Sequence, residues 1–569
     1  MIEFFLRSSR HEMVSPALGQ FPKSACVGNN SIYDFVVIMK LKRPQLVPKG
    51  SIVRLLQAAE QAWSRQDFQQ NLELLERAHN LNPSNPSILL QLGRVQGLRF
   101  NYAAAEEYFE KAVRLSNHKA EMLSAAGMQS RDFYNPALAE KYLRQAAEQK
   151  NASPGMLVQL AELYEFLRRP ADANQLVERA LQLDRAFPPA LLALAKLERQ
   201  AGRFEKAEML LRSLLPTADQ NTRVRSNYLL GAILDHQGRY DEAMSAFIEA
   251  KSTFQSWAGQ FFIQRQIVGA HLREMLTSIS AEIFQRWFDF GREMLQPPRR
   301  LGLLCGHPRS GTTLLEQVLD SHPDIISAEE TNIFYEHVYI PLARARPQEA
   351  PRPGLPLQFQ MSFPVELSVL EAAQTDLIRQ SRQTYFHNME LCLGQPINNR
   401  LLIDKNPSFS LMLLGFQRVF PEIKLLVALR DPRDVCLSCF MQHFTPLNLR
   451  NSAYLNLKDT VEEYVEDMNI WRTLAPLIQG RHLEVRYEDI VNDLESVSRR
   501  TLDFLGVPWD AKVLHFDEHA LQKRVRTPSY ADVAKPVFKT SIGRWRNYQK
   551  YLEPYLHRLE PFVKAFGYE

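Results

Sequence analysis

The stretch best suited to bind an anion is 306–313, which reads Gly-His-Pro-Arg-Ser-Gly-Thr-Thr. It follows an apolar run at 301–305 and precedes a stretch with helical periodicity at 314–320. This order predicts a buried strand, a small-residue loop and a helix whose free N-terminal amides face an anion. A nucleotide-triphosphatase loop would carry Gly-Lys-Ser/Thr here, whereas Arg309 supplies the charge in this chain. We therefore expect the loop to hold an oxyanion other than the phosphates of ATP.

The segment from 308 to 331 resembles a known family. Its loop, Pro-Arg-Ser-Gly-Thr-Thr at 308–313, resembles the 5′-phosphosulfate loop of sulfotransferases that use 3′-phosphoadenylyl sulfate (PAPS). The His-Pro turn at 322–323 and the Glu-Glu-Thr run at 329–331 are similar to the tyrosylprotein sulfotransferases. The resemblance implies that PAPS is the co-substrate and that no metal is needed. It also implies that five consecutive residues hold the 5′-phosphosulfate: Arg309, Ser310, Gly311, Thr312 and Thr313.

Two neighbouring glutamates are the candidates for the catalytic base. Adjacent residues on an extended segment point to opposite sides, so only one of Glu329 and Glu330 should face the donor, and the residues alone do not decide which. The resemblance assigns the role to Glu330. Lys405 ends the apolar run at 401–403, which places its ammonium in the crevice beside the anion loop of an α/β sheet. There it would neutralise the bridging oxygen of the donor as the S–O bond breaks, and Arg309 would assist.

A second group of residues is expected to bind the nucleotide part of the donor. The apolar run at 425–429 ends at Arg430, and Ser438 follows at the start of a predicted helix. In sulfotransferases such a pair holds the 3′-phosphate, for which a forked guanidinium is well suited. Arg433, flanked by aspartates, is the candidate for a structural ion pair instead.

The resemblance extends toward the C-terminus. The remaining residues that it places at the donor are Tyr487, Ser529, Lys535 and Arg544, and Ser529 would also assist at the transferring sulfuryl group. Two positions depart from the tyrosylprotein enzymes, because Arg544 stands where they have a lysine and Gln442 where they have an arginine. Fewer nucleotide contacts are therefore expected than in those enzymes.

Composition bounds the class of protein. The chain has 569 residues, which is too long for one hydrophobic core and indicates at least two domains. The formal net charge is only +4, from 68 basic and 64 acidic side chains, so we expect no nucleic-acid partner. Five cysteines and the lack of an apolar stretch of about 20 residues predict a cytoplasmic location and no membrane span. Cys436 and Cys439 have no second ligand pair, which favours packing over a zinc site.

The N-terminal half repeats with a period of 34 residues. Small residues recur at six positions, the last shifted by two: Ala59, Gly93, Gly127, Ala161, Ala195 and Gly231. Larger residues keep the same step: Leu75, Phe109, Leu143, Val177, Leu211 and Phe247. This is the tetratricopeptide signature, in which small residues let the two helices of a hairpin approach closely and larger ones fill the gap to the next repeat. We place the two-residue shift in the turn around 217–222.

These patterns predict the domain organisation. Residues 1–50 are expected to be a poorly ordered lead, 51–296 a solenoid of six helical hairpins with capping helices at its end, and 297–569 the catalytic domain. In the last region, short apolar runs alternate with helical stretches, which is typical of an α/β domain with a parallel sheet. These runs are 301–305, 401–403, 424–429 and 482–486. The expected fold is an all-α tetratricopeptide solenoid followed by an α/β, P-loop-like sulfotransferase domain.

The functional hypothesis is a PAPS-dependent sulfotransferase that acts on a hydroxyl group of an acceptor recruited by the repeats. A protein tyrosine is one candidate acceptor, and a carbohydrate, a lipid or a small metabolite stays open, as does a homodimer. The alternative outside enzymes is a repeat adaptor that binds nucleotide without turnover. A small-molecule kinase is disfavoured because the loop lacks a lysine.

Overall fold

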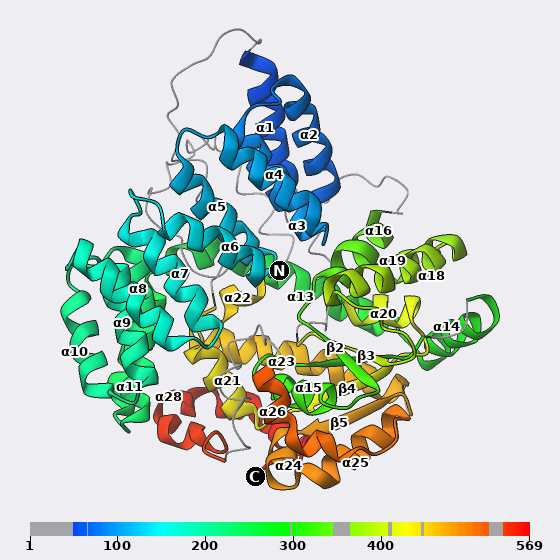
Figure 1. Cartoon of the computed structure of the whole chain (residues 1–569). Helices are drawn as coiled ribbons and strands as arrows, with labels where there is room; N and C mark the ends of the chain where they lie inside the picture. The colour runs from blue at the N-terminus through cyan, green and yellow to red at the C-terminus, as the bar shows by residue number, and fades with distance from the viewer. Residues whose placement is uncertain are drawn as a thin grey trace, which may run out of the picture.

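The computed structural model describes residues 49–64, 67–295, 299–344, 365–407, 412–444, 449–478, 480–522 and 539–569. A region of helical hairpins comes first, and an α/β part with a parallel sheet follows it (Figure 1). This order confirms the predicted fold class. The N-terminal lead, apart from its last two residues, lies outside the described residues. No helix within the described ranges is long and apolar enough to span a bilayer.

Within residues 49–252 of the described chain, twelve helices pair into six hairpins. They are α1 Lys49–Ser64, α2 Phe68–Leu81, α3 Pro86–Leu98, α4 Tyr102–Leu115, α5 Lys119–Asp132, α6 Pro136–Ala147, α7 Pro154–Phe166, α8 Pro170–Leu183, α9 Pro188–Gln200, α10 Phe204–Leu214, α11 Gln220–His236 and α12 Tyr240–Ser252. Local signals set where several of them begin. Helix α3 starts with a proline after the capping side chain of Asn85, and α7 starts in the same way after Ser153.

The small residues of the repeat lie where two helices touch. A Cβ atom on Gly93 would stand 2.4 Å from the ring of Phe109, and one on Gly231 would stand 2.8 Å from the ring of Phe247. Both rings belong to the column of larger residues in the sequence pattern. The 34-residue period is therefore a packing period, in which a missing side chain on the first helix makes room for a large one on the second.

The turn between the two helices of a hairpin has the same backbone conformation in successive repeats. Its left-handed residues are Phe100, Tyr134, Arg168, Gly202 and Gly238, with φ between 57° and 76°. The last interval, from Gly202 to Gly238, is longer than the others. Helix α11 has 17 residues, whereas α3, α5, α7 and α9 have 13 or 14, so the extra length lies between the end of α10 and the first turns of α11. This segment overlaps the predicted one.

Two further helices connect the repeats to the sheet, namely α13 (Gln255–Thr277) and α14 (Ala281–Met294). The apolar side chains from Leu272 to Trp287 join the core of the α/β part, together with α20 (Leu413–Val419) and α23 (Leu457–Leu474). Helices α13 and α14 were expected to cap the array, but their buried apolar residues pack in the core of the α/β part. The reason is that α14 carries Ile283, Phe284 and Trp287 on one buried face, which needs a broad apolar surface to cover it.

The sheet has five parallel strands in the order β2-β3-β1-β4-β5. They are β1 Leu301–Gly306, β2 Ile325–Glu329, β3 Leu401–Lys405, β4 Lys424–Leu429 and β5 His482–Arg486. The edge strand β2 was not among the predicted strands. Helices cover both faces (Figure 1). On one face lie α14, α20, α23 and α19 (Thr375–Leu393), and on the other α15 (Thr312–Asp320), α24 (Tyr487–Asn492), α25 (Leu494–Leu505) and α26 (Phe516–Gln522).

One cluster of buried apolar side chains contains residues of both the repeats and the α/β part. Leu437 and Phe440 of α21 (Pro432–Met441), with Trp545 and Tyr548 of η5 (Arg544–Tyr548), pack among the buried side chains of α9 to α12. Lys251 of α12 is fully buried and donates a hydrogen bond of 2.6 Å to the carbonyl oxygen of Tyr454. The end of the array is therefore fixed against helix α21, at the carboxyl edge of the sheet where functional loops gather.

The first repeats also touch the α/β part. Arg344 of α16 (Ile340–Arg344) forms an ion pair of 2.9 Å with Asp67, which caps helix α2. Phe100, in the turn between α3 and α4, packs against the core of the α/β part. The array thus meets the second part of the molecule near both of its ends.

Candidate active site

The predicted anion loop connects β1 to helix α15. Gly311 directly precedes the helix with φ of 91°, and Arg309 also has a left-handed backbone, with φ of 71°. A Cβ atom on Gly311 would lie 2.7 Å from the ring of Tyr487, so only glycine fits between the loop and this tyrosine. The left-handed conformation of Arg309 is uncommon for a residue with a side chain and marks a backbone that its surroundings hold in place.

Arg309, Arg430, Ser438 and Tyr487 come together around this loop. The Nε atom of Arg309 donates a hydrogen bond of 3.0 Å to the Oγ of Ser438. Arg430, which follows β4, donates to the carbonyl oxygen of Arg309 at 3.2 Å and lies 4.9 Å from the ring centre of Tyr487. Two guanidinium groups, a hydroxyl and an aromatic ring therefore surround the loop, which suits a ligand with anionic groups and a planar ring.

Asp434 ties the C-terminal segment to this cluster. Its carboxylate accepts hydrogen bonds from the backbone N–H groups of Gly543, at 2.7 Å, and Trp545, at 2.8 Å. Burial raises the pKa of Asp434 above its ordinary value. Arg433 forms the predicted structural ion pair, because its guanidinium contacts the carboxylate of Asp431 at 2.7 Å.

The other predicted residues near the C-terminus are placed differently or lie outside the description. Arg544 forms an ion pair of 2.7 Å with Asp235 of α11, which also accepts a hydrogen bond of 2.7 Å from Tyr548. Arg544 is thus a link to the repeats, and its role toward the nucleotide stays a prediction. Ser529 and Lys535 lie outside the described residues.

A lysine and three carboxylates form the second half of the candidate site. Lys405 and Glu329 are register partners at the ends of the neighbouring strands β3 and β2. The Lys405 Nζ atom is completely buried, and it lies 2.7 Å from Glu330 Oε1, 3.6 Å from Glu329 Oε1 and 3.5 Å from Glu316 Oε2. Burial alone would favour the neutral amine, but the attraction of Glu316, Glu330 and Glu329 raises the pKa of Lys405 above its ordinary value. Lys405 is therefore an ammonium at neutral pH.

The two adjacent glutamates both reach this ammonium. The expectation that only one of them would face the site relied on an extended backbone. Glu330 instead has φ of 47°, and its backbone N–H donates to the Lys405 carbonyl oxygen at 2.7 Å, so its side chain turns back toward Lys405. The side chain of Glu329 is 4% exposed and that of Glu330 is 40% exposed. Of the two carboxylates, Glu330 is the one that an incoming group can reach.

Sequence reasoning missed three buried residues beside Lys405. Glu316 approaches it from α15, and on the other face of the sheet the Tyr385 hydroxyl donates to Asp404 at 2.7 Å. Burial raises the pKa of Asp404 to about 7. One signal was available in the sequence, because Glu316 is a charged residue between the apolar residues of the helix predicted after the anion loop.

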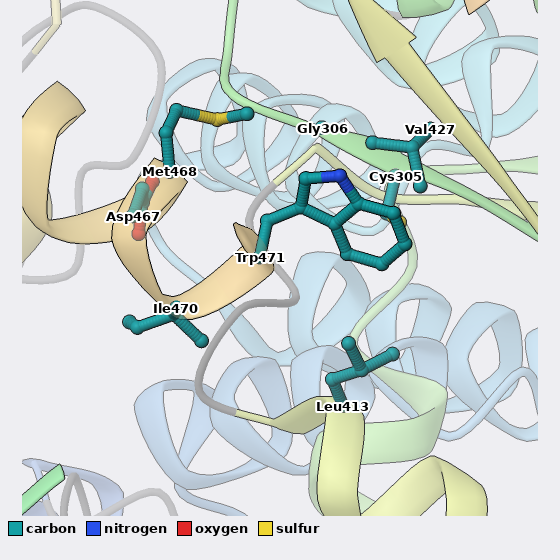
Figure 2. Close-up of a pocket in the computed structure, with 8 residues that line it drawn as sticks. All are labelled: Cys305, Gly306, Leu413, Val427, Asp467, Met468, Ile470 and Trp471. Atoms are coloured by element: carbon teal, nitrogen blue, oxygen red, sulfur yellow. The ribbon is translucent and has the colours of Figure 1, made fainter. Parts of the chain in front are cut away.

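A small cavity of about 30 Å³ lies beside β1 (Figure 2). It is lined by Cys305, Gly306, Leu413, Val427, Asp467, Met468, Ile470 and Trp471. Asp467 is held by Arg450 through bonds of 2.7 and 3.0 Å. Such a volume holds a few water molecules at most, so this cavity is too small for a nucleotide. Cys436 and Cys439 are buried nearby in the core, as the packing interpretation predicted.

An anion loop at a strand end, a buried lysine and an accessible carboxylate define a domain suited to group transfer from a nucleotide. Comparison with known proteins specifies the class. Residues 303–511 match the sulfotransferase family, and residues 86–119, 167–227 and 224–253 match tetratricopeptide repeats. The chain thus carries a sulfotransferase-family domain behind a tetratricopeptide repeat region.

Individual relatives are distant. The chain is 29% identical over 248 residues to protein-tyrosine sulfotransferase 1 of Danio rerio, covering 42% of this chain and 64% of that protein. It is 28% identical over 373 residues to an uncharacterized protein of Aquifex aeolicus, covering 63% of this chain and 44% of the other. The chain therefore spans about half to two thirds of the length of these relatives. The sulfotransferase domain from a Synechococcus olefin synthase aligns with a TM-score of 0.31 at 22% identity, over 48% of this chain and 96% of that domain.

Proposed function

We propose that the chain is a PAPS-dependent sulfotransferase that moves a sulfuryl group to a hydroxyl of an acceptor recruited by the repeats. The observation that carries the proposal is the pair of Lys405 and Glu330, 2.7 Å apart at the strand ends of a sulfotransferase-family domain. A buried ammonium beside an accessible carboxylate provides both groups that the reaction requires. The ammonium stabilises the leaving oxygen, and the carboxylate takes the proton.

The proposed reaction is an in-line displacement at sulfur. The bond between sulfur and the bridging oxygen of PAPS breaks, a bond between sulfur and the acceptor oxygen forms, and 3′,5′-ADP leaves. Glu330 accepts the proton of the acceptor hydroxyl, and Lys405 neutralises the charge that develops on the phosphate oxygen. Arg309 and, outside the described residues, Ser529 are assigned to the sulfuryl group.

Donor binding is assigned to the loop and its neighbours. The residues from Arg309 to Thr313 would hold the 5′-phosphosulfate with their amides and hydroxyls. Arg430 and Ser438 would hold the 3′-phosphate, which the contact of 3.0 Å between Arg309 and Ser438 supports, because it brings both phosphate sites beside the same loop. The ring of Tyr487 packs against Gly311 and would line the nucleotide. Lys535 and Arg544 complete the assignment.

The acceptor class is proposed from the repeats. Tetratricopeptide arrays commonly bind peptides or other proteins, which favours a protein acceptor, and the similarity to protein-tyrosine sulfotransferases favours a tyrosine hydroxyl. A carbohydrate, lipid or metabolite acceptor is the second candidate. A cytoplasmic location is also a proposal, supported by the buried, unbridged thiols of Cys305, Cys436 and Cys439.

Incubation of the full chain with PAPS labelled at the sulfuryl group and a cell extract tests the proposal. Label transferred to polypeptide that survives lipid extraction and glycosidase treatment supports a protein acceptor. Label in glycan or lipid overturns the protein assignment. No transfer to any fraction, together with tight calorimetric binding of 3′,5′-ADP, favours the nucleotide-binding adaptor.

A further inference from the structure

Glu316 is a buried carboxylate that the proposed reaction leaves without a role. It lies on α15, in the second turn after the anion loop, and its side chain is fully buried. One of its oxygens, Oε1, accepts a hydrogen bond of 2.7 Å from the hydroxyl of Ser327. The other, Oε2, lies 3.5 Å from the Nζ of Lys405. The carboxylate thus connects the Ser327 side chain of strand β2 to the Lys405 ammonium.

The orientation of Glu316 is itself fixed by neighbours. The Ser327 backbone N–H donates to Asp320 Oδ1 at 2.6 Å, and the other Asp320 oxygen lies 2.7 Å from the Nε2 of His519 on α26. Both Glu316 and Asp320 belong to α15, so two carboxylates of one helix hold the same serine of β2 from two sides. A fully buried carboxylate is costly unless hydrogen bonds and a cation compensate its charge, and Ser327 and Lys405 provide these for Glu316.

The proposed reaction requires that the Lys405 ammonium stays in place while Glu330 is protonated. When Glu330 takes a proton from the acceptor it becomes neutral, and its attraction for Lys405 is lost at the moment when the ammonium must face the leaving oxygen. Glu316 cannot be reached by the acceptor and remains paired with Lys405 through that step. A second, shielded carboxylate therefore keeps the ammonium charged and in place while the first one titrates.

The other charged groups around Lys405 do not supply this function equally. Glu329 lies at a similar distance, 3.6 Å, but its side chain stays slightly exposed, whereas that of Glu316 is fully buried and accepts a hydrogen bond from Ser327. Asp404 points to the other face of the sheet, where Tyr385 donates to its carboxylate. Among the charge–charge attractions that raise the pKa of Lys405, that of Glu316 comes first, ahead of those of Glu330 and Glu329, and Glu330 adds a hydrogen bond. The attraction of Glu316 is large although it lies 3.5 Å from Nζ, because both groups are completely buried.

We propose that Glu316 is a positioning residue, which holds the Lys405 ammonium in place for sulfuryl transfer by a contact that persists when Glu330 is protonated. This inference rests on the proposed function of the same site. It assigns no contact between Glu316 and either substrate.

The test compares Glu316→Gln, which keeps the shape and removes the charge, with wild type and with Glu316→Asp. We expect Glu316→Gln to lower kcat about tenfold or more while the KM for PAPS changes less than about threefold, since the lost contact acts on the leaving group. The alkaline limb of its kcat–pH profile should move to lower pH, because Lys405 loses a fully buried counter-charge. Glu316→Asp should recover most of kcat and the wild-type pH profile. A profile unchanged in Glu316→Gln, or a Glu316→Asp variant no better than Glu316→Gln, would overturn the assignment.

A binding measurement separates this inference from the proposed function. Calorimetric titration of 3′,5′-ADP at alkaline pH, in two buffers of different ionisation enthalpy, counts the protons taken up on binding. Wild type should take up no proton at Lys405, because this residue is already protonated, whereas Glu316→Gln should take up a fraction of one proton there. If wild type does not bind 3′,5′-ADP, the proposed function fails. If both bind with the same proton uptake, only the role of Glu316 fails.

Should Glu316→Gln not fold, Ser327→Ala replaces it. A smaller shift of the kcat–pH profile in the same direction is then expected, and an unchanged profile would count against the proposal.

Discussion

A charge cluster of the repeat array and the charge cluster of the candidate active site combine acids and cations in opposite proportions. In the array, the carboxylate of Glu162 lies between two guanidinium groups, 2.5 Å from Arg225 and 3.5 Å from Arg131. At the site, the ammonium of Lys405 lies among the carboxylates of Glu316, Glu329 and Glu330. The cluster at Glu162 therefore places one acid between two cations, and the cluster at Lys405 places one cation among three acids.

This difference separates a structural charge from a chemical one. Burial opposes the ionisation of Glu162, yet Arg225 and Arg131 lower its pKa to about 2, so this carboxylate stays charged at every physiological pH. At the site, the Lys405 ammonium is the group that is held in its charged form, and three carboxylates are paired with it. One of them can accept a proton while the ammonium keeps a partner. The comparison predicts that removing an acid destabilises the array and disables the chemistry at the site.

The largest expected effect is on turnover, through Glu330→Gln. We expect kcat for sulfuryl transfer to fall by about 10² to 10⁴, because the only strongly exposed carboxylate of the described trio loses its ability to take a proton. Binding of 3′,5′-ADP, measured by calorimetry, should stay within about threefold of wild type. The matched control is Glu329→Gln, next to it and almost fully buried, for which kcat should fall less than about tenfold. Equal losses in both variants would contradict the assignment of the base.

In the array, the matching substitution is Glu162→Gln, which should act on stability alone. Loss of the carboxylate charge leaves the partly buried guanidinium groups of Arg131 and Arg225 with less compensation, and the loss of a charge-assisted hydrogen bond costs about 1.5 to 3 kcal/mol. Because folding lowers the pKa of Glu162, its stabilising contribution is complete above its ordinary value of 4.5 and is lost as the pH falls toward 2. Thermal unfolding of both proteins at pH 7 and at pH 3 should therefore show a gap in midpoint that narrows at the lower pH. A constant gap would mean that the charge of Glu162 is not what stabilises the array.

A smaller effect is expected for Arg430→Ala, which removes a cation assigned to the donor. We expect the affinity for 3′,5′-ADP to fall about 10- to 100-fold, the usual consequence of losing a charge-assisted hydrogen bond. The affinity for 5′-AMP, which lacks the 3′-phosphate, serves as the control and should change little. Equal weakening of both ligands would show that Arg430 acts by supporting the loop, through its bond to the Arg309 carbonyl, and not by contacting the 3′-phosphate.

Local signals made a large part of this molecule predictable. The loop at Arg309 and the strands before Lys405 and Arg430 are encoded in short apolar runs and small residues, and the repeats in a fixed period. What could not be predicted depends on contacts between distant segments. The meeting of Glu316 with Lys405 requires the order of the strands in the sheet, and the pairing of Arg544 with Asp235 requires the docking of the array.

Backbone conformation was the other obstacle. The positive φ of Glu330 turns its side chain toward Lys405, and alternation along an extended strand gives no sign of it. The place of α14 on the α/β part was equally hidden, because an amphipathic helix does not reveal which apolar surface it will cover. The candidate site was therefore predictable as a set of residue types, and not as a geometry.

The smallest expected effect tests the packing of the array without altering any charge. Gly93→Ala places a methyl group 2.4 Å from the Phe109 ring, and the overlap must be relieved by shifting two helices that touch closely. Overpacking of this kind costs about 1 to 3 kcal/mol.

The control is Gly155→Ala in α7, where the new methyl would meet nothing nearer than 3.7 Å and the residue already lies in a helix. There we expect no loss, and a gain of up to about 1 kcal/mol from the reduced freedom of the unfolded chain. Thermal unfolding should rank the proteins as Gly155→Ala, wild type and Gly93→Ala, and kcat should be the same in all three, because neither glycine lies near the charges of the site. A loss of kcat in Gly93→Ala without a loss of stability would show that the first repeats act on the chemistry directly, and the division between a stabilising array and a reacting site would no longer hold.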